Sequence, residues 1–262
     1  MIARMFRNIC ITLALILAAA PALAAPAPAA GPGDKKRYED CLTLAGLNPS
    51  AALGVAGKWA GERGGPPAQH CAALSLIALK RYGEAAAKLD AIARAPDMGS
   101  LRSSLFGQAG NAWILAGEAS KAVASFQGAL VLSASDPDLY ADLARAQAMQ
   151  SDWADAEADL TAALAISPRR ADLLILRASA RRAQNHFADA RKDAAAALAL
   201  SPRNPEALIE RGSIARDSGD LKAARLDFVA ALSSNPSPAA ANTAKRNLAA
   251  LDKAAKPVLK KK

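Results

Sequence analysis

One phrase recurs in this chain at a fixed distance. LAISPRR occupies residues 164–170, and LALSPRN occupies residues 198–204, which lies 34 residues further on. Proline keeps the same spacing at Pro168, Pro202 and Pro236. A period of this length is typical of proteins that stack copies of one small structural unit. The repeat limits the possible fold more than any other feature of the chain.

Small and large side chains occupy further columns with the same spacing. One column holds small side chains, at Ala122, Ala156, Ala190 and Ala224. The next column holds mostly large side chains, at Phe126, Leu160, Ala194 and Phe228. We expect two helices of about 13 residues in each unit, which approach closely at the small columns. Since proline cannot donate the backbone hydrogen bond that a continuing helix needs, it ends the second helix. One hairpin cannot bury its apolar face alone, so the units should stack.

These columns resemble the tetratricopeptide repeat (TPR) family over residues 103–236, and more weakly over residues 66–96. The family's early tryptophan column is replaced by Phe106, Tyr140, Leu174 and Leu208. The resemblance implies an all-α fold, a right-handed superhelical solenoid of helix-turn-helix repeats. It also implies a non-catalytic scaffold that binds another protein or a peptide on its concave face.

The composition supports helices, because 52% of the residues are hydrophobic and only 4% are aromatic, with alanine supplying much of the apolar share. We divide the chain into six segments around this helical array. They are a signal peptide (1–24), a flexible Ala/Pro/Gly lead (25–34), a diverged N-terminal helical hairpin (35–65), the TPR-like array (66–236), a C-terminal capping helix (237–254) and a basic tail (255–262).

The first segment has the pattern of a secretory signal. Arg4 and Arg7 precede a 12-residue apolar core, and the small residues Ala22 and Ala24 predict cleavage near Ala24. A membrane anchor is the competing interpretation, but a spanning helix needs roughly 20 apolar residues. We therefore expect an exported, periplasmic protein with no integral membrane span in its mature form.

The net charge is +9 at neutral pH, and part of it lies at the two ends of the chain. No aromatic residues are interleaved with the basic ones, and no recognition motif occurs, so nucleic acid is not an expected partner. The expected partner is another protein or a peptide, and the oligomeric state is left open. The alternative is a structural spacer in an envelope complex, in which Lys260, Lys261 and Lys262 contact an anionic surface.

The chain offers little for catalysis. Its two histidines, His70 and His186, are far apart in sequence, and the HEXXH, CXXC and P-loop motifs are absent. A Cys71–His70 nucleophile pair and a carboxylate pair within residues 151–159 are less favoured than structural roles. Trp113 and Trp153 sit at packing positions, and Trp59 is less clear. We therefore expect no enzyme activity, no cofactor and no metal.

The repeat phase also predicts which side chains line the concave face. From successive first helices these are Asn111, Leu115, Arg145, Met149, Ile175, Ser179, Arg182, Ile209, Ser213 and Arg216. Arg182 and Arg216 are one repeat apart and should stand in a row. Because arginine can hold a carboxylate with two hydrogen bonds, we expect a peptide with apolar and acidic side chains or a free C-terminus.

Acidic and basic columns predict a ladder of ion pairs between neighbouring repeats. Each acid on a second helix is followed 18 residues later by a base, in the pairs Asp159–Arg177, Asp193–Arg211 and Asp227–Lys245. In the preceding repeat both places lack charge. We assign this ladder a structural role.

Two cysteines remain after removal of the signal, Cys41 and Cys71. Both fall in first helices of adjacent hairpins, which pack side by side, and export places them where disulfides persist. We predict a Cys41–Cys71 disulfide that holds the N-terminal hairpin on the array. Two independent buried thiols are the alternative.

Overall fold

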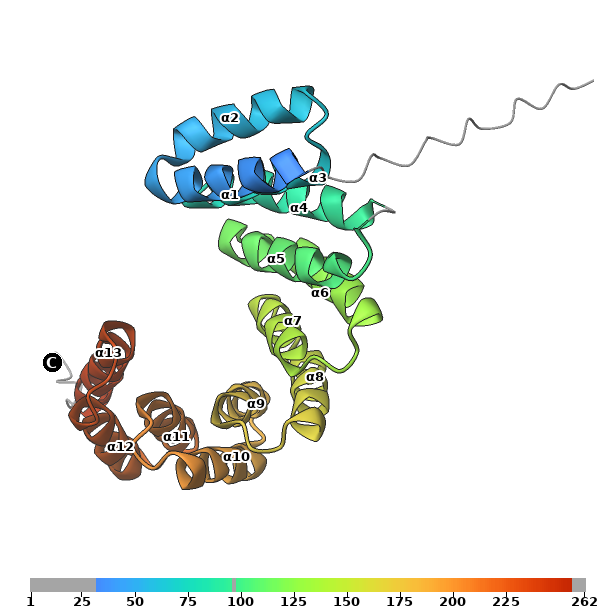
Figure 1. The fold of residues 1–262 in the computed structure, drawn as a ribbon. Helices are drawn as coiled ribbons and strands as arrows, with labels where there is room; N and C mark the ends of the chain where they lie inside the picture. The colour runs from blue at the N-terminus through green and yellow to red at the C-terminus, as the bar shows by residue number, and fades with distance from the viewer. Residues whose placement is uncertain (1–31, 96–97, 256–262) are drawn as a thin grey trace, which may run out of the picture.

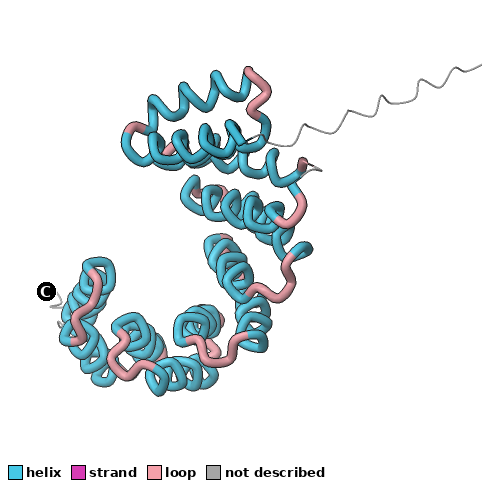
Figure 2. Tube along the Cα trace, viewed as in Figure 1, coloured by secondary structure: helices cyan, strands magenta, loops and turns pink. Residues whose placement is uncertain are grey.

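The computed structural model describes residues 32–95 and 98–255. Within these ranges the chain forms thirteen helices and no strand, and short loops join the helices (Figure 2). The helices are α1 (Pro32–Leu47), α2 (Pro49–Gly61), α3 (Gly65–Ala78), α4 (Tyr82–Arg94), α5 (Leu101–Ala116), α6 (Ala119–Leu132), α7 (Pro137–Met149), α8 (Trp153–Ile166), α9 (Ala171–Ala183), α10 (Phe187–Leu200), α11 (Pro205–Asp217), α12 (Leu221–Ser233) and α13 (Pro238–Ala255).

The helices form six antiparallel hairpins and a final single helix, stacked into a curved solenoid (Figure 1). The first helices of successive hairpins contact one another, from α5 to α7, α9, α11 and then α13. In Figure 1, α9 and α11 lie on the inner side of the curve, and α10 and α12 lie on its outer side. The all-α solenoid expected from the repeat is confirmed.

A left-handed residue turns the chain from the first to the second helix of each regular repeat. It is Gly117, Ser151, Asn185 or Gly219, spaced one repeat apart, with φ angles of 78°, 65°, 62° and 93°. The residue after each of them donates its N–H to a carbonyl in the last turn of the helix, as in Glu118 N to Trp113 O at 3.0 Å. Only two of the four are glycine, which is why this column escapes notice in the sequence.

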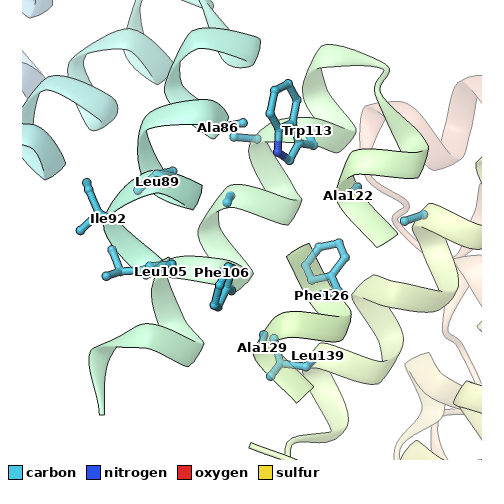
Figure 3. Packing of buried hydrophobic residues seen from close by; sticks show 14 of the residues in the cluster. Ala86, Leu89, Ile92, Leu105, Phe106, Trp113, Ala122, Phe126, Ala129 and Leu139 are labelled. Carbon is cyan, nitrogen blue, oxygen red and sulfur yellow. The ribbon is translucent and has the colours of Figure 1, made fainter. Parts of the chain in front are cut away.

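Large rings fill the space inside each hairpin where the opposing helix carries a small residue. A Cβ added to Gly110 would lie 2.6 Å from the ring of Phe126, and one added to Gly212 would lie 2.8 Å from Phe228. Figure 3 shows Phe126 and Trp113 packed among residues of α4, α5 and α6. The small and large columns are therefore the two sides of one interface, which leaves the rings almost fully buried.

The N-terminal hairpin is attached to the array by a covalent bond, and polar contacts hold its own two helices together. The sulfur atoms of Cys41 on α1 and Cys71 on α3 lie at bonding distance, 1.96 Å, with Cα atoms 6.2 Å apart. Both side chains are buried. Arg37 donates to Glu62 at 2.6 Å and lies over the ring of Trp59, which is itself buried. The structure thus contains the disulfide that joins first helices of adjacent hairpins.

The predicted ion-pair ladder between repeats is wrong. Arg177 makes two hydrogen bonds to Asp193, at 2.9 and 2.8 Å, and Arg211 makes two to Asp227, at 2.9 and 2.6 Å. In both cases the partners belong to the same hairpin and are 16 residues apart. Lys245 is exposed and has no ion pair within the described residues.

Asp159 has no arginine partner. It accepts a hydrogen bond from Nε2 of Gln147 at 2.8 Å, again inside its own hairpin. Burial raises the pKa of Asp159, and this hydrogen bond offsets only part of the effect. The Oε1 atom of Gln147 is buried and has no hydrogen-bond partner. The α7–α8 hairpin therefore carries an incompletely satisfied polar contact where the two hairpins that follow it carry salt bridges.

One arginine does connect two repeats. Arg181 on α9 donates to Glu157 on α8 at 2.7 Å and to Asp193 on α10 at 2.8 Å. Glu157 also accepts from Gln184 at 2.8 Å. Although burial alone would raise the pKa of Glu157, the hydrogen bonds from Arg181 and Gln184 hold it below its usual value. Inter-repeat charge pairing exists, but through a residue outside the predicted columns.

Candidate functional site: the concave face

The residues predicted to line the concave face all lie on the first helices α5, α7, α9 and α11. Asn111, Leu115, Arg145 and Met149 are exposed, Ile175, Ser179, Arg182, Ile209 and Arg216 are half-buried, and Ser213 is buried. The Ser213 hydroxyl donates to the carbonyl of Ile209 in its own helix at 2.8 Å. Its assignment to an open surface is therefore wrong.

Arg182 and Arg216 come together as expected, but carboxylates of this chain occupy both. Arg182 donates to Glu210 at 2.7 Å and to Asp217 at 2.8 Å. Arg216 donates to the other oxygen of Asp217 at 2.8 Å and to Asn247 on α13 at 2.6 Å. The prediction that these arginines hold a ligand carboxylate loses its basis, because their donors already join α9, α11 and α13.

This arginine cluster shifts the pKa values of its two acids in opposite directions. Burial raises the pKa of Glu210, and the contact with Arg182 offsets only part of that effect. For Asp217, burial acts in the same direction, but the hydrogen bonds from Arg216 and Arg182 outweigh it and lower its pKa. Asp217 is thus the anion that the two guanidinium groups hold in place.

Nearer the N-terminus, the first helices are joined by side-chain hydrogen bonds in which no partner, or only one, is charged. Tyr38 on α1 contacts Nδ1 of His70 on α3 at 2.6 Å, and Nε2 of His70 contacts Gln108 on α5 at 2.9 Å. Asn111 on α5 donates to Asp142 on α7 at 3.1 Å. Polar links therefore run from first helix to first helix along much of the inner row.

Two of these links share a spacing that the sequence contains. Asn111 and Asp142, like Arg216 and Asn247, are 31 residues apart, which is one repeat less about one helical turn. Polar residues at this offset face each other across neighbouring first helices. This offset of 31 residues is the sequence signal from which such links could be predicted.

The exposed apolar side chains among the predicted concave-face residues lie towards the N-terminal half of that face. Leu115 and Met149, one repeat apart, are 57% and 47% exposed. The next residues in the same column are Ala183, also exposed, and Asp217. Arg145 beside them pairs with Asp142 of its own helix. An apolar surface therefore continues into a polar one along a single column.

An open cavity of about 660 Å³ adjoins Leu115, between the start of α4 and the end of α5. Trp113 lines it, and the Lys121 ammonium lies 4.6 Å from the ring centroid. The indole N–H donates to buried Asp90 at 2.9 Å, and the residue is only 8% exposed. Trp113 is therefore chiefly a packing residue, as the repeat phase predicts. Trp59 is also buried.

A second cavity, of about 580 Å³, lies between the N-terminal ends of α1, α3 and α5 and the end of α4. The sequence pattern did not predict it, because part of its wall comes from the diverged hairpin and from the irregular junction before α5. Among the described residues, no three acidic, histidine or cysteine side chains are placed to hold a metal. In the same ranges, no helix has the length and hydropathy needed to cross a membrane.

Comparisons with known proteins concern the fold. No family model matches the sequence, and no curated protein matches it. Part of a TPR repeat-containing protein from Cytophaga hutchinsonii superposes with a TM-score of 0.62 at 14% identity, covering 84% of this chain and 96% of that one. A thermophilic TPR protein from Thermus thermophilus gives 0.56 at 18% identity, over 71% and 99% of the two chains.

YrrB, described as a TPR protein with an unusual peptide-binding site, gives a TM-score of 0.52 at 17% identity, over 68% of this chain and 91% of its own. All three solved structures are TPR proteins, and each covers more than two thirds of this chain. The periodic columns, the stacked hairpins and these superpositions agree: the chain is a solenoid with the TPR fold.

Proposed function

We propose that this protein is a non-catalytic scaffold that binds a segment of another protein along its concave face, in the cell envelope. The observation that carries the proposal is the exposed apolar column of Leu115 and Met149. Large apolar side chains on the inner face of a solenoid are typical of an extended binding surface. YrrB, which has the same fold, is described as peptide-binding, and this supports the same use of the fold here.

The segment that we propose as ligand carries apolar side chains. The pairing of Arg182 and Arg216 within the chain removes the reason to require an acidic side chain or a free C-terminus. The ligand would place two apolar groups about one repeat apart against Leu115 and Met149, and its polar groups would lie nearer Asp217. Apolar burial supplies the affinity, and the surrounding polar residues set the direction of the segment.

Two features support an envelope location. The leader pattern of residues 1–24 lies outside the described residues and remains a prediction. The buried Cys41–Cys71 bond is the second feature, because disulfides of this kind persist in oxidising compartments and are rare in the cytosol.

The test is recovery of a partner from an envelope extract by the purified chain. Leu115→Gln combined with Met149→Gln replaces the apolar column with polar side chains of similar size. The matched control is Val131→Gln, because Val131 is 85% exposed on the second helix α6. Loss of a discrete partner with the double variant alone supports the proposal.

Equal recovery by all three proteins contradicts the concave-face assignment. The spacer alternative predicts something different, which is association with the envelope that depends only on Lys260, Lys261 and Lys262. A truncation before Lys260 that releases the protein, while the double variant stays bound, would favour the spacer.

A further inference from the structure

The cavity of about 580 Å³ at the N-terminal end of the array has the size of a small-molecule site. It lies where α1, α3 and α5 converge, and the end of α4 closes one side. Its position relies on the Cys41–Cys71 bond, because that bond fixes α1 against α3. The cavity is separate from Leu115 and Met149, so what it binds does not depend on the function proposed above.

The walls of this cavity are mostly apolar. Pro66, Pro67, Ile92, Met98, Leu101 and Leu105 contribute them. Leu101 is 62% exposed although it lies beside this hollow, and Leu105 and Ile92 are buried. An apolar body that entered the cavity would cover Leu101 and remove its surface from water, which favours binding.

Inside the cavity, the polar groups are neutral and already paired with one another. Gln108 Nε2 donates to Ser104 Oγ at 3.3 Å, so Gln108 Oε1 is the acceptor of the His70 Nε2–H. His70 Nδ1 then accepts the hydroxyl of Tyr38 at 2.6 Å. Burial raises the pKa of Tyr38, which keeps the phenol neutral. These four polar residues therefore suit an uncharged body and offer no counter-charge.

Three charged residues line the cavity, Arg63, Lys35 and the half-buried Asp34, so positive charge predominates. Lys35 makes only a long, exposed contact of 4.0 Å with Glu39. Arg63 is exposed, and within the described ranges no carboxylate pairs with it. Most other arginines of the described chain hold a carboxylate of the chain, whereas Arg63, like Arg169, holds none, and Arg63 lies beside an apolar cavity.

We propose that this cavity binds a small amphiphilic carboxylate, with its apolar body between α3, α4 and α5 and its carboxylate on Arg63. The ligand chemistry follows from the apolar walls and the unpaired cation at their edge. A fatty acid is the simplest molecule with both parts. Tyr38 and His70 take no part in charge pairing and form the polar limit of the site.

The probe is dodecanoate, titrated into the full mature chain by calorimetry and compared with dodecanol and with acetate. We expect dodecanoate to bind roughly five-fold or more tightly than dodecanol, as one partly exposed ion pair allows. Acetate lacks the apolar body and should give no binding. The preference for dodecanoate should shrink at high salt, because the pair is partly exposed.

Two variants locate the site. Ser104→Trp places a large ring in the cavity from an exposed helical position, and should weaken dodecanoate binding at least ten-fold. Its control, Ala124→Trp on the exposed face of α6, should leave binding unchanged. Arg63→Asn keeps a residue that tolerates the left-handed backbone at φ 66°, and should abolish the preference over dodecanol. Arg63→Lys should restore most of it, and Arg169→Asn is the matched arginine control.

Dodecanoate that binds Ser104→Trp as tightly as the parent protein would overturn the site. Equal affinity for dodecanoate and dodecanol, or an Arg63→Asn variant with an unchanged preference, would overturn the carboxylate assignment. Circular dichroism and thermal unfolding confirm that each variant is folded before its affinity is compared. The Leu115→Gln, Met149→Gln protein should bind dodecanoate normally, which separates this proposal from the concave-face one.

Discussion

The two halves of the solenoid hold their hairpins together by different means. From α1 to α7 the links are a disulfide, a tyrosine–histidine–glutamine chain and an aromatic core around Trp113 and Phe126. From α8 to α13 they are arginine–carboxylate clusters. The same column of the concave face is apolar in the first half and ends at Asp217 in the second. One repeat geometry thus accepts either kind of contact, and the choice decides which surface stays free for a ligand.

Removing the arginine that connects α8, α9 and α10 should have the largest effect. Arg181→Met leaves Glu157 without its arginine partner and deprives Asp193 of one of its two. Since Asp193 is buried and the Glu157 side chain is only 24% exposed, we expect a loss of roughly 3–5 kcal/mol in the free energy of unfolding. Urea denaturation measures it. The control is Arg225→Met, which removes an exposed pair with Asp252 and should cost under about 1 kcal/mol. Similar losses in the two variants would contradict a buried role for Arg181.

Removing the Cys41–Cys71 disulfide of the first half should lower the free energy of unfolding by slightly less. The disulfide closes a loop of 30 residues, which the chain-entropy model values at roughly 3–4 kcal/mol. Cys41→Ala with Cys71→Ala should therefore expose the N-terminal hairpin to limited proteolysis before the rest of the array. Thiol titration of the denatured, unreduced parent is the direct check, and two free thiols would exclude the bond. Protease sites that first appear in α9 to α12 would argue against a local role.

Asp159→Asn tests the weak contact between the halves and should stabilise the protein at neutral pH. Two facing amides can exchange two hydrogen bonds, which would satisfy Gln147 Oε1 and contribute about 1 kcal/mol. Folding raises the pKa of Asp159 above 3.8, so the native state holds the proton more tightly and the parent loses stability as pH rises through that interval. The difference in the free energy of unfolding between the variant and the parent should shrink as pH falls towards 3.8. An advantage that is constant from pH 7 to pH 4 would show that charge burial is not its cause.

The turn column should give the smallest effect. Ser151 adopts the left-handed conformation that its equivalents Gly117 and Gly219 adopt without a Cβ penalty. Ser151→Gly should raise the free energy of unfolding by about 0.5–1 kcal/mol, seen as a small rise in the thermal midpoint. Ala124→Gly, at an exposed position inside α6, should lower it by about the same amount. If both changes destabilise equally, the turn does not strain the serine.

The repeat columns predict the helices and their stacking, and they place the expected inner-face residues on first helices, but they assign the buried Ser213 to an open surface. They fail for the ion pairs for a geometric reason. A base 18 residues after one acid lies 16 residues before the next, and these two offsets add up to one period, so the columns alone cannot choose between the pairings. Asp159 favoured the wrong choice, because Leu143 occupies the matching basic position and Gln147, one turn later, provides its contact. The cavity beside Arg63 was beyond prediction, since part of its wall comes from segments outside the repeat register.

Because the disulfide is buried, the rate at which it is reduced reports how the first hairpin opens. The side chains of Cys41 and Cys71 are 1% and 0% exposed, so a reductant cannot reach either sulfur while α1 lies against α3. If hairpin closing is fast relative to reduction, the rate of thiol release follows the population of the open form. If reduction is fast relative to closing, the rate of thiol release follows the rate at which the hairpin opens. Varying the reductant concentration therefore gives both quantities for one hairpin of the solenoid, without a label.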